Sequence, residues 1–142
     1  AAVMPCFAFD TPEGFCYGFP GLDDRGVKVA EHTGGRVVTN PLDIDRAIDP
    51  EEQSRIEAWI AEYLPAVSPR RTDHKVCLYT MSPDGHFLLG LHPGHPQVAV
   101  AAGFSGHGYK FASVVGEILA DLSLGGGTRS PIGFLSPARF LR

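Results

Sequence analysis

Lysine and histidine, two residue types that often do chemistry, stand four residues apart in Val27-Lys-Val-Ala-Glu-His32. The stretch alternates as a strand does, so Lys28, Ala30 and His32 share one face and the two valines lie on the other. A lysine in such a strand usually faces solvent, whereas a buried charge would be costly unless it served chemistry. Lys28 and His32 are therefore candidate catalytic residues.

A thiol and a phenol lie two residues apart in a second apolar run, Val76-Cys-Leu-Tyr-Thr80. If residues 74–80 form a strand, alternation places Cys77 and Tyr79 side by side on one face. Most lone cysteines in strands are buried structural residues, so the pair by itself indicates no particular reaction.

A glycine-rich turn, Gly103-Phe-Ser-Gly-His-Gly108, links the apolar run 97–102 to a helix predicted over residues 111–124. Such a turn can present backbone N–H groups and the positive end of a helix dipole to an anionic ligand, and His107 and Lys110 add side-chain donors there. An ordinary tight strand–helix connection explains the glycines equally well. The turn matches neither Gly-x-Gly-x-x-Gly nor Gly-x-Ser-x-Gly, so it carries neither a dinucleotide fingerprint nor a nucleophile elbow.

Four histidines cluster late in the chain. Their spacing matches no standard zinc pattern, and no cysteine or carboxylate joins them closely. The two in His92-Pro-Gly-His95 are more simply interpreted as part of a turn. We therefore expect no metal site, and a histidine metal-binding domain is the weakest alternative. The four are His86, His92, His95 and His107.

Composition is typical of a globular protein with one domain's worth of residues. The chain has 142 residues, of which 44% are hydrophobic and 20% charged, and it contains no apolar run long enough to span a bilayer. The net charge of −4 and the lack of a basic patch beyond Arg70-Arg71 argue against a nucleic-acid partner, and we expect no membrane partner. Three cysteines without metal-type spacing suit a reducing compartment, and residues 1–5 do not resemble a signal peptide, so we expect a cytoplasmic protein.

Periodicity and turn signals indicate the elements that position these residues. The clearest helix runs from about Pro50 to Leu64, because Asp49 is a good N-cap and Glu52 completes a capping-box spacing. Trp59 lies on its apolar stripe, where packing is the default role. Residues 130–142 are expected to form an extended arm. Strands are predicted at residues 4–9, 15–19, 27–32, 74–80, 86–92 and 97–102.

Several of these stretches together resemble one family of flavoenzymes. The chain resembles, over nearly its whole length, the C-terminal part of the monomeric sarcosine oxidase and N-methyltryptophan oxidase family. Its most specific motif is the glycine turn combined with the Cys-x-Tyr strand. The matching stretches are Tyr17-Gly-Phe-Pro20, Lys28-Val-Ala-Glu-His32, Cys77-Leu-Tyr-Thr-Met-Ser-Pro-Asp-Gly-His-Phe87, Gly103-Phe-Ser-Gly-His-Gly-Tyr-Lys-Phe111 and Val115-Gly-Glu-Ile-Leu119.

The resemblance implies an FAD-dependent oxidase that converts secondary amino acids and O2 into an imine and hydrogen peroxide. It implies that Cys77 carries FAD covalently, and that Lys28 promotes the reaction with O2, because a fixed positive charge stabilises developing superoxide. Lys110 would bind the substrate carboxylate. The helix after the glycine turn would direct its positive end at the flavin. The resemblance also implies substrate-pocket residues, Tyr17, His32 and Tyr79, and a loop against the flavin, Gly106, His107 and Gly108.

The implied fold is α+β, as part of a two-domain flavoprotein oxidase. Residues 1–96 would belong to the antiparallel sheet and helix of a substrate-binding domain, and residues 97–142 would supply the last strand, glycine turn, helix and tail of an FAD-binding domain. Gly85 and Gly90 depart from the family pattern, which tends to have larger or acidic residues there. The dinucleotide-binding N-terminal half is absent, so we expect the chain to need a partner chain or self-association.

Two hypotheses from different classes follow. In the first, the chain is the Cys-flavinylated part of an oxidase of N-methyl amino acids such as sarcosine, or of an acidic or imino acid oxidase of the same family, and is inactive by itself. In the second, it is a truncated binding or interaction module that holds no FAD. The set of Cys77, Lys28 and Lys110 favours the first hypothesis, and the missing phosphate-binding fingerprint favours the second for the chain by itself.

Overall fold

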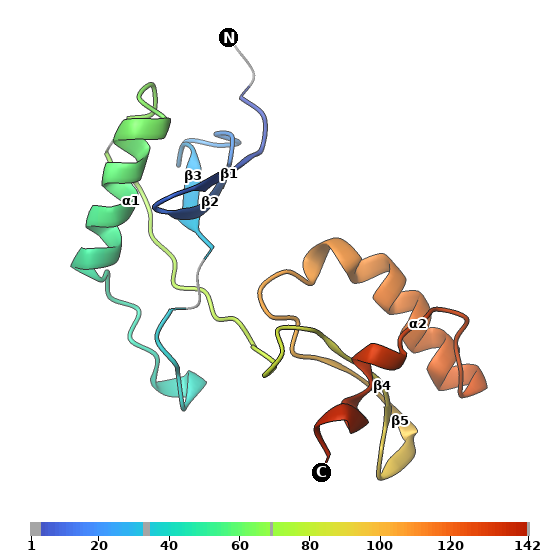
Figure 1. Cartoon of the computed structure of the whole chain (residues 1–142). Coiled ribbons are helices and arrows are strands. Elements are labelled where there is room, and N and C mark those ends of the chain that lie inside the picture. Colours follow the sequence, from blue (N-terminus) through green and yellow to red (C-terminus); the bar gives the residue numbers. More distant parts are fainter. Residues whose placement is uncertain (1–3, 33–34, 69, 142) are drawn as a thin grey trace. The chain divides into compact units, whose positions relative to one another are not determined.

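The computed structural model describes residues 4–32, 35–68 and 70–141, which fall into two compact units (Figure 1). The first unit ends at Cys77 and the second begins at Leu78. Each contains one antiparallel sheet and one long helix, so the architecture is α+β as predicted. The predicted domain boundary at 96/97 falls inside a strand of the second unit, and the assignment to substrate and FAD domains stays a prediction. The prediction that the chain does not begin with a signal peptide depends on residues 1–5, and residues 1–3 lie outside the described part.

The first unit is built on a three-stranded meander, and each of its strands overlaps one predicted from the sequence. Its strands pair antiparallel in sequence order: β1 (Phe7–Thr11), β2 (Gly14–Phe19) and β3 (Lys28–Glu31). The register sets Cys16 opposite Glu31 and Tyr17 opposite Ala30. Because neighbouring residues of a strand face opposite ways, Cys16 and Tyr17 lie on different faces of this sheet.

One long helix, α1 (Pro50–Tyr63), packs on the face that carries Cys16. It begins as predicted, because the Asp49 carboxylate accepts hydrogen bonds from the N–H groups of Glu51 and Glu52 and a proline occupies the first turn. A short 3-10 turn, η1 (Pro41–Asp43), precedes it. The predicted N-cap role of Asp49 is thus confirmed.

Trp59 packs α1 against the sheet. Its side chain is only 4% exposed, and its ring centre lies 5.7 Å from that of Phe9 and 5.1 Å from that of Tyr63. The indole Nε1 donates a hydrogen bond to Thr11 Oγ1 at 3.3 Å, so the polar end of this buried ring is satisfied. The predicted packing role of Trp59 is confirmed.

The second unit packs a hairpin against a helix. β4 (Leu88–His92) and β5 (His95–Ala102) pair antiparallel, and a 3-10 turn, η2 (Tyr109–Phe111), leads into α2 (Ala112–Gly125). Strand, glycine turn and helix therefore follow one another as predicted. Among the described residues, no helix is both long and apolar enough to cross a bilayer. The buried core of the unit comprises Leu89, Val115, Ile118 and Leu122.

The tail is not the extended arm expected from the sequence. It forms two short 3-10 turns, η3 (Gly133–Leu135) and η4 (Pro137–Phe140), which pack on β4. A Cβ at Gly90 would lie 3.1 Å from Pro137 Cδ, so the missing side chain lets the tail approach the strand closely.

The strand predicted at residues 74–80 is wrong. Residues 71–80 have no regular secondary structure. A segment becomes a strand only when a neighbouring strand supplies a ladder of hydrogen bonds. The backbone hydrogen bond from Ser105 N–H to Thr80 O, at 3.0 Å, does not by itself make a ladder.

We expect Trp59→Ala to lower the free energy of unfolding of the first unit by about 3–5 kcal/mol, because it empties a buried aromatic site. Trp59→Phe keeps most of the packing and loses the hydrogen bond to Thr11, so its expected cost is about 1 kcal/mol. Urea unfolding followed by circular dichroism measures both variants. Equal losses would contradict the packing role assigned to the indole.

Candidate functional site

The face of the first sheet that points away from α1 brings together three predicted site residues. Lys28 Nζ donates a hydrogen bond to Tyr17 Oη at 3.2 Å and lies 4.6 Å from the centre of the Tyr17 ring. The His32 ring centre lies 6.3 Å from that of Tyr17, with the two planes at 78°. Cross-strand pairing explains the group, because Ala30, the partner of Tyr17, stands between Lys28 and His32 on this face.

Two phenylalanines extend this face beyond the predicted residues. The Phe19 ring centre lies 5.0 Å from Lys28 Nζ, and the Phe15 ring centre lies 5.9 Å from that of His32. Phe19 is 41% exposed and Phe15 is 40% exposed, so aromatic surface stands open beside the two basic side chains. Their alternation with Tyr17 is the sequence signal that identifies them. We call this set the aromatic–basic face: Phe15, Tyr17, Phe19, Lys28 and His32.

The aromatic–basic face suits an anionic or a flat aromatic ligand. The Lys28 ammonium is held by cation–π attraction to two rings in addition to its hydrogen bond with Tyr17. Lys28 is exposed, as the ordinary interpretation of a strand lysine predicts. Its charge is therefore both localised and available to a group that binds on this face.

The glycine turn in the second unit has a backbone that requires its glycines. Gly106 has a φ of +79°, and Ser105 before it has a φ of +49°. A Cβ at Gly106 would lie 2.9 Å from the Tyr79 ring, so Tyr79 packs directly on the turn. A Cβ at Gly108 would lie 2.5 Å from the Phe104 ring. Three predicted site residues, Tyr79, Gly106 and Gly108, are thus part of one packed turn.

Ser105 fixes this turn to the segment that precedes β4. Its N–H donates to Thr80 O at 3.0 Å, and its hydroxyl accepts from Ser82 N–H at 3.2 Å and donates to Gly103 O at 3.1 Å. Both serines are buried, so these hydrogen bonds are sheltered from water. Ser105 is a site residue that the sequence does not reveal, because its neighbours are those of any turn serine.

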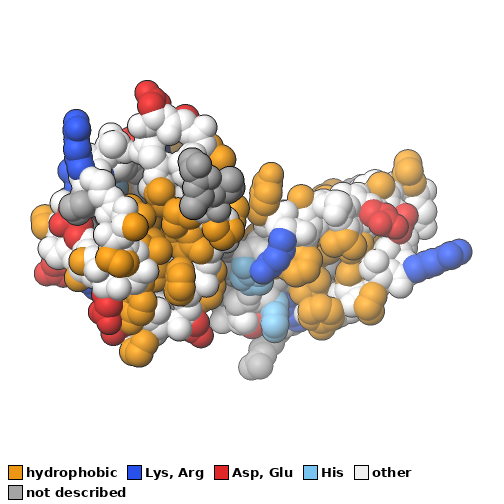
Figure 2. Space-filling view, turned by 90° about the horizontal axis from the view of Figure 1, so that it is seen from above, with side chains coloured by type: hydrophobic (Ala, Val, Ile, Leu, Met, Phe, Trp, Pro, Cys, Tyr) orange, Lys and Arg blue, Asp and Glu red, His pale blue; other side chains and the backbone are white. Residues whose placement is uncertain are grey.

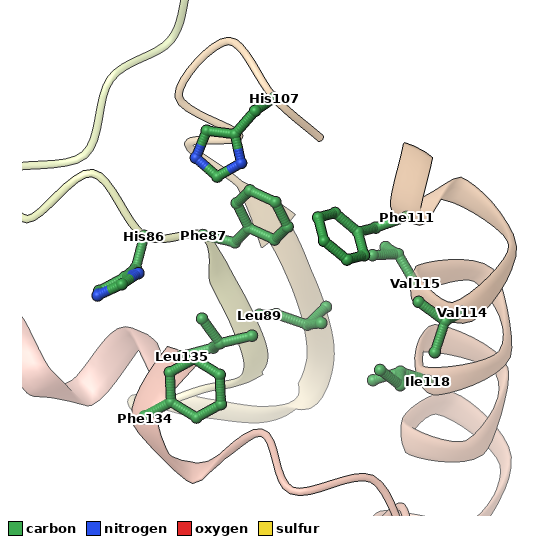
Figure 3. Close-up of a pocket in the computed structure, with 10 residues that line it drawn as sticks. All are labelled: His86, Phe87, Leu89, His107, Phe111, Val114, Val115, Ile118, Phe134 and Leu135. Atoms are coloured by element: carbon green, nitrogen blue, oxygen red, sulfur yellow. The ribbon is translucent and has the colours of Figure 1, made fainter. Parts of the chain in front are cut away.

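His107 lies at one end of an apolar hollow in the second unit (Figure 3). Its ring lies against the buried Phe87, with centres 4.9 Å apart and planes at 36°, and its Nε2 is 3.2 Å from the carbonyl oxygen of Gly85. The hollow has a volume of about 230 Å³. Its apolar walls come from β4, η2, α2 and the tail, and include Leu89, Phe111, Val114, Ile118, Phe134 and Leu135.

Lys110 lies in η2, where the chain enters α2. It is exposed, and its Nζ lies 5.7 Å from the centre of the Phe111 ring. Within the described residues, no side chain forms a capping hydrogen bond at the start of η2 or of α2. The positive end of the helix dipole and the Lys110 ammonium together retain the predicted capacity to bind an anion.

The strand on which Cys77 and Tyr79 were expected to meet does not form, and the two residues fall in different units. Cys77 is a free and exposed cysteine. Cys16 is free but buried, and burial raises the pKa of its thiol. Cys77 is therefore the better placed of the two to react with a ligand, because the thiolate is the reactive form and access is required.

The four late histidines do not form one cluster. Among the residues that the structure describes, no three His, Cys, Asp or Glu side chains lie close enough to hold a metal ion. His92 and His95 face each other across the β4–β5 turn, with ring centres 5.0 Å apart. His86 and His107 contact the aromatic rings of Phe134 and Phe87 respectively.

Comparison with known proteins gives one family and several full-length relatives. A family model described as FAD dependent oxidoreductase (DAO) matches residues 1–122. Monomeric sarcosine oxidase of Bacillus sp. (strain B-0618) is 42% identical over 135 residues, which cover 94% of this chain and 34% of the relative. N-methyl-L-tryptophan oxidase of Citrobacter koseri is 34% identical, with 98% of this chain and 37% of the relative covered. The chain thus spans about a third of the length of the curated relatives it matches.

Two solved structures share the fold. NikD, an unusual amino acid oxidase essential for nikkomycin biosynthesis, gives a TM-score of 0.72 at 24% identity, covering 94% of this chain and 37% of that chain. L-proline dehydrogenase from P. horikoshii gives a TM-score of 0.75 at 21% identity, covering 95% of this chain and 38% of that chain. Likeness at this level of identity concerns the fold alone.

We expect Gly106→Ala to destabilise the second unit by roughly 1–3 kcal/mol, because it forces a left-handed backbone on alanine and pushes a methyl group into Tyr79. Gly116→Ala is the matched control inside α2, where an added Cβ meets nothing within 4 Å. Alanine there should stabilise by roughly 0.5–1 kcal/mol. Thermal unfolding measures both, and a Gly106→Ala variant as stable as the parent would show that Tyr79 does not pack on the turn.

Proposed function

The chain belongs to the FAD dependent oxidoreductase family, and on that premise we propose that it forms the C-terminal part of an oxidase of N-methyl amino acids such as sarcosine. In that reaction the C–N unit of the amine loses two hydrogen atoms to become an imine, and O2 takes them up as hydrogen peroxide. The observation that carries the proposal is the aromatic–basic face, where Lys28, Tyr17 and His32 lie together. The 42% identity to a monomeric sarcosine oxidase supports this substrate class.

The residues present suit FAD as the cofactor, which accepts the electrons of the amine when it is bound. A reactive thiol can attach an aromatic ring system covalently, and a fixed cation and the positive end of a helix can stabilise its negative charge. This chain offers each of these, in the exposed Cys77, in Lys28 and at the start of α2. We assign Gly106, His107 and Gly108 to the loop on the flavin side of the site.

We assign Lys28 to the reaction with O2. A fixed ammonium stabilises the negative charge that O2 gains when it accepts electrons. Tyr17 and Phe19 hold the ammonium without neutralising its charge, whereas a carboxylate partner would neutralise it. This support suits a lysine whose charge has to remain available for catalysis.

We assign the substrate contacts separately within each unit. The ammonium of Lys110 binds the carboxylate of the amino acid through a charge-assisted hydrogen bond, and the positive end of α2 adds to the attraction. In the first unit we assign Tyr17 and His32 to the substrate pocket, with the His32 ring orientation held by edge contacts to Phe15 and Tyr17. In the second unit we assign Tyr79 to contact with the substrate.

Cys77 is assigned to covalent attachment of the flavin. Cys77 would hold the flavin through a thioether bond, and the two hydrogen atoms lost from the thiol and the flavin would be taken up by O2 as hydrogen peroxide. The thiol is free and exposed, so nothing in the first unit has to move for it to react.

A second candidate function, an interaction module without FAD, is favoured by the apolar surface that both units expose (Figure 2). Exposed apolar surface of this kind needs a partner. In the oxidase, that partner is the dinucleotide-binding portion of the enzyme or a second copy of the chain, in the cytoplasm. The large exposed residues include Leu22, Val37 and Leu42 in the first unit and Tyr109, Leu124 and Phe134 in the second.

Covalent attachment can be tested in a chimera in which this chain replaces the matching segment of the Bacillus relative. After acid precipitation, we expect flavin absorbance to remain with the protein of the parent chimera and to be lost from Cys77→Ser. Cys6→Ser removes another exposed thiol and should retain the flavin. Flavin that washes out of the parent chimera would contradict the role of Cys77. A folded chimera that binds no flavin would favour the interaction module.

In the same chimera, we expect Lys28→Met to slow peroxide production with excess amine by a factor on the order of 10² or more, because the charge that stabilises reducing O2 is gone. Arg70→Met, which removes an exposed cation elsewhere in the first unit, is the control and should leave the rate unchanged. A Lys28→Met rate equal to that of the parent would show that Lys28 has no part in the O2 reaction.

A further inference from the structure

One arginine ties the C-terminal tail to the turn before β4. Arg139 Nε and Nη2 donate to the two carboxylate oxygens of Asp84 at 2.8 and 3.1 Å, and Nη2 also donates to His86 O at 3.4 Å. Its Nη1 donates to the carbonyl oxygens of Leu135 and Ser136 at 2.8 and 3.1 Å. The planar guanidinium thus holds tail and turn together in a geometry that a lysine could not reproduce.

Asp84 organises the turn that Arg139 contacts. Its Oδ1 accepts hydrogen bonds from His86 N–H and from the Ser82 hydroxyl, each at 3.0 Å. The Arg139 guanidinium holds the pKa of the Asp84 carboxyl well below its usual range, so the pair stays ionised at neutral pH. The turn is therefore closed by charge-assisted hydrogen bonds as well as by its backbone.

Gly85 lies between the two turn residues to which Arg139 is bonded. It has a φ of +72°, and its carbonyl oxygen lies 3.2 Å from His107 Nε2. Because Asp84 and His86 are both held, the direction of this carbonyl is fixed. A carbonyl oxygen only accepts hydrogen bonds, so Nε2 carries the proton, and Nδ1 is the acceptor of the neutral ring.

We propose that Arg139 is a positioning residue that acts through Asp84 and the Gly85 carbonyl to hold His107 in the Nε2-protonated tautomer. His107 then presents Nδ1 as a hydrogen-bond acceptor. A ligand that places an N–H donor beside Nδ1 is therefore favoured. The identity of the ligand rests on the proposed function, in which His107 lies on the flavin side. The tautomer itself depends only on contacts within the second unit.

The test is the tautomer of His107 in the full chain, labelled with 15N at histidine and measured by long-range 1H–15N correlation at mildly alkaline pH. His107→Gln identifies the signals of this ring. In the parent we expect a pyrrole-type Nε2 and a pyridine-type Nδ1. In Arg139→Met and in Asp84→Asn we expect the two nitrogen shifts to converge, because the freed ring samples both tautomers.

Two further variants separate positioning from general stability. Arg129→Met removes an exposed arginine just before the tail and should leave the His107 signals unchanged. Arg139→Lys keeps the charge and should not restore the parent signals. Where Arg139→Met unfolds the second unit, Asp84→Asn decides, because it keeps the size of the side chain.

The proposal is overturned by an Nδ1-protonated His107 in the parent. It is overturned equally by an unchanged Nε2-protonated ring in the folded Arg139→Met or Asp84→Asn variants. Failure of the proposed function looks different, because the chimera would then bind no flavin while the parent tautomer signature persisted.

Discussion

The packing of Trp59 determines which way the first sheet faces. Its buried indole contacts Phe9, so α1 lies over that side of the sheet. Because strand residues alternate, Tyr17 and Lys28 are then committed to the other side, where they contact each other. A slip of one residue between β2 and β3 would move the β3 side chains to the opposite face of the sheet. The Lys28 charge would then be buried under α1, at a large desolvation cost. The chemistry assigned to the first unit therefore depends on a packing contact on its opposite side.

In the second unit, glycines determine how closely the tail and the turns approach one another. Gly90 lets Pro137 approach β4, and Gly85 takes a positive φ in the turn whose carbonyl reaches His107. The coupling of tail and turn, closed by Arg139, thus depends on both glycines.

Local patterns in the sequence predicted the local features. The cap at Asp49 predicted the start of α1, and alternation predicted the shared face of Lys28 and His32, because each depends on neighbouring residues. The strand at 74–80 failed because a strand also needs a partner, which alternation cannot supply. The bond between Arg139 and a carboxylate 55 residues away follows from the tertiary fold, so no local pattern marks it. The same holds for the contact of Phe19 with Lys28.

The central claim is that the aromatic–basic face of the first sheet is a ligand-binding surface. A crystal structure of the chimera with FAD tests it most directly. The account predicts that the flavin ring lies over this face, with Lys28 Nζ in direct or single-water contact with it. A flavin bound elsewhere, with Tyr17 and Lys28 covered by protein side chains, would contradict the account.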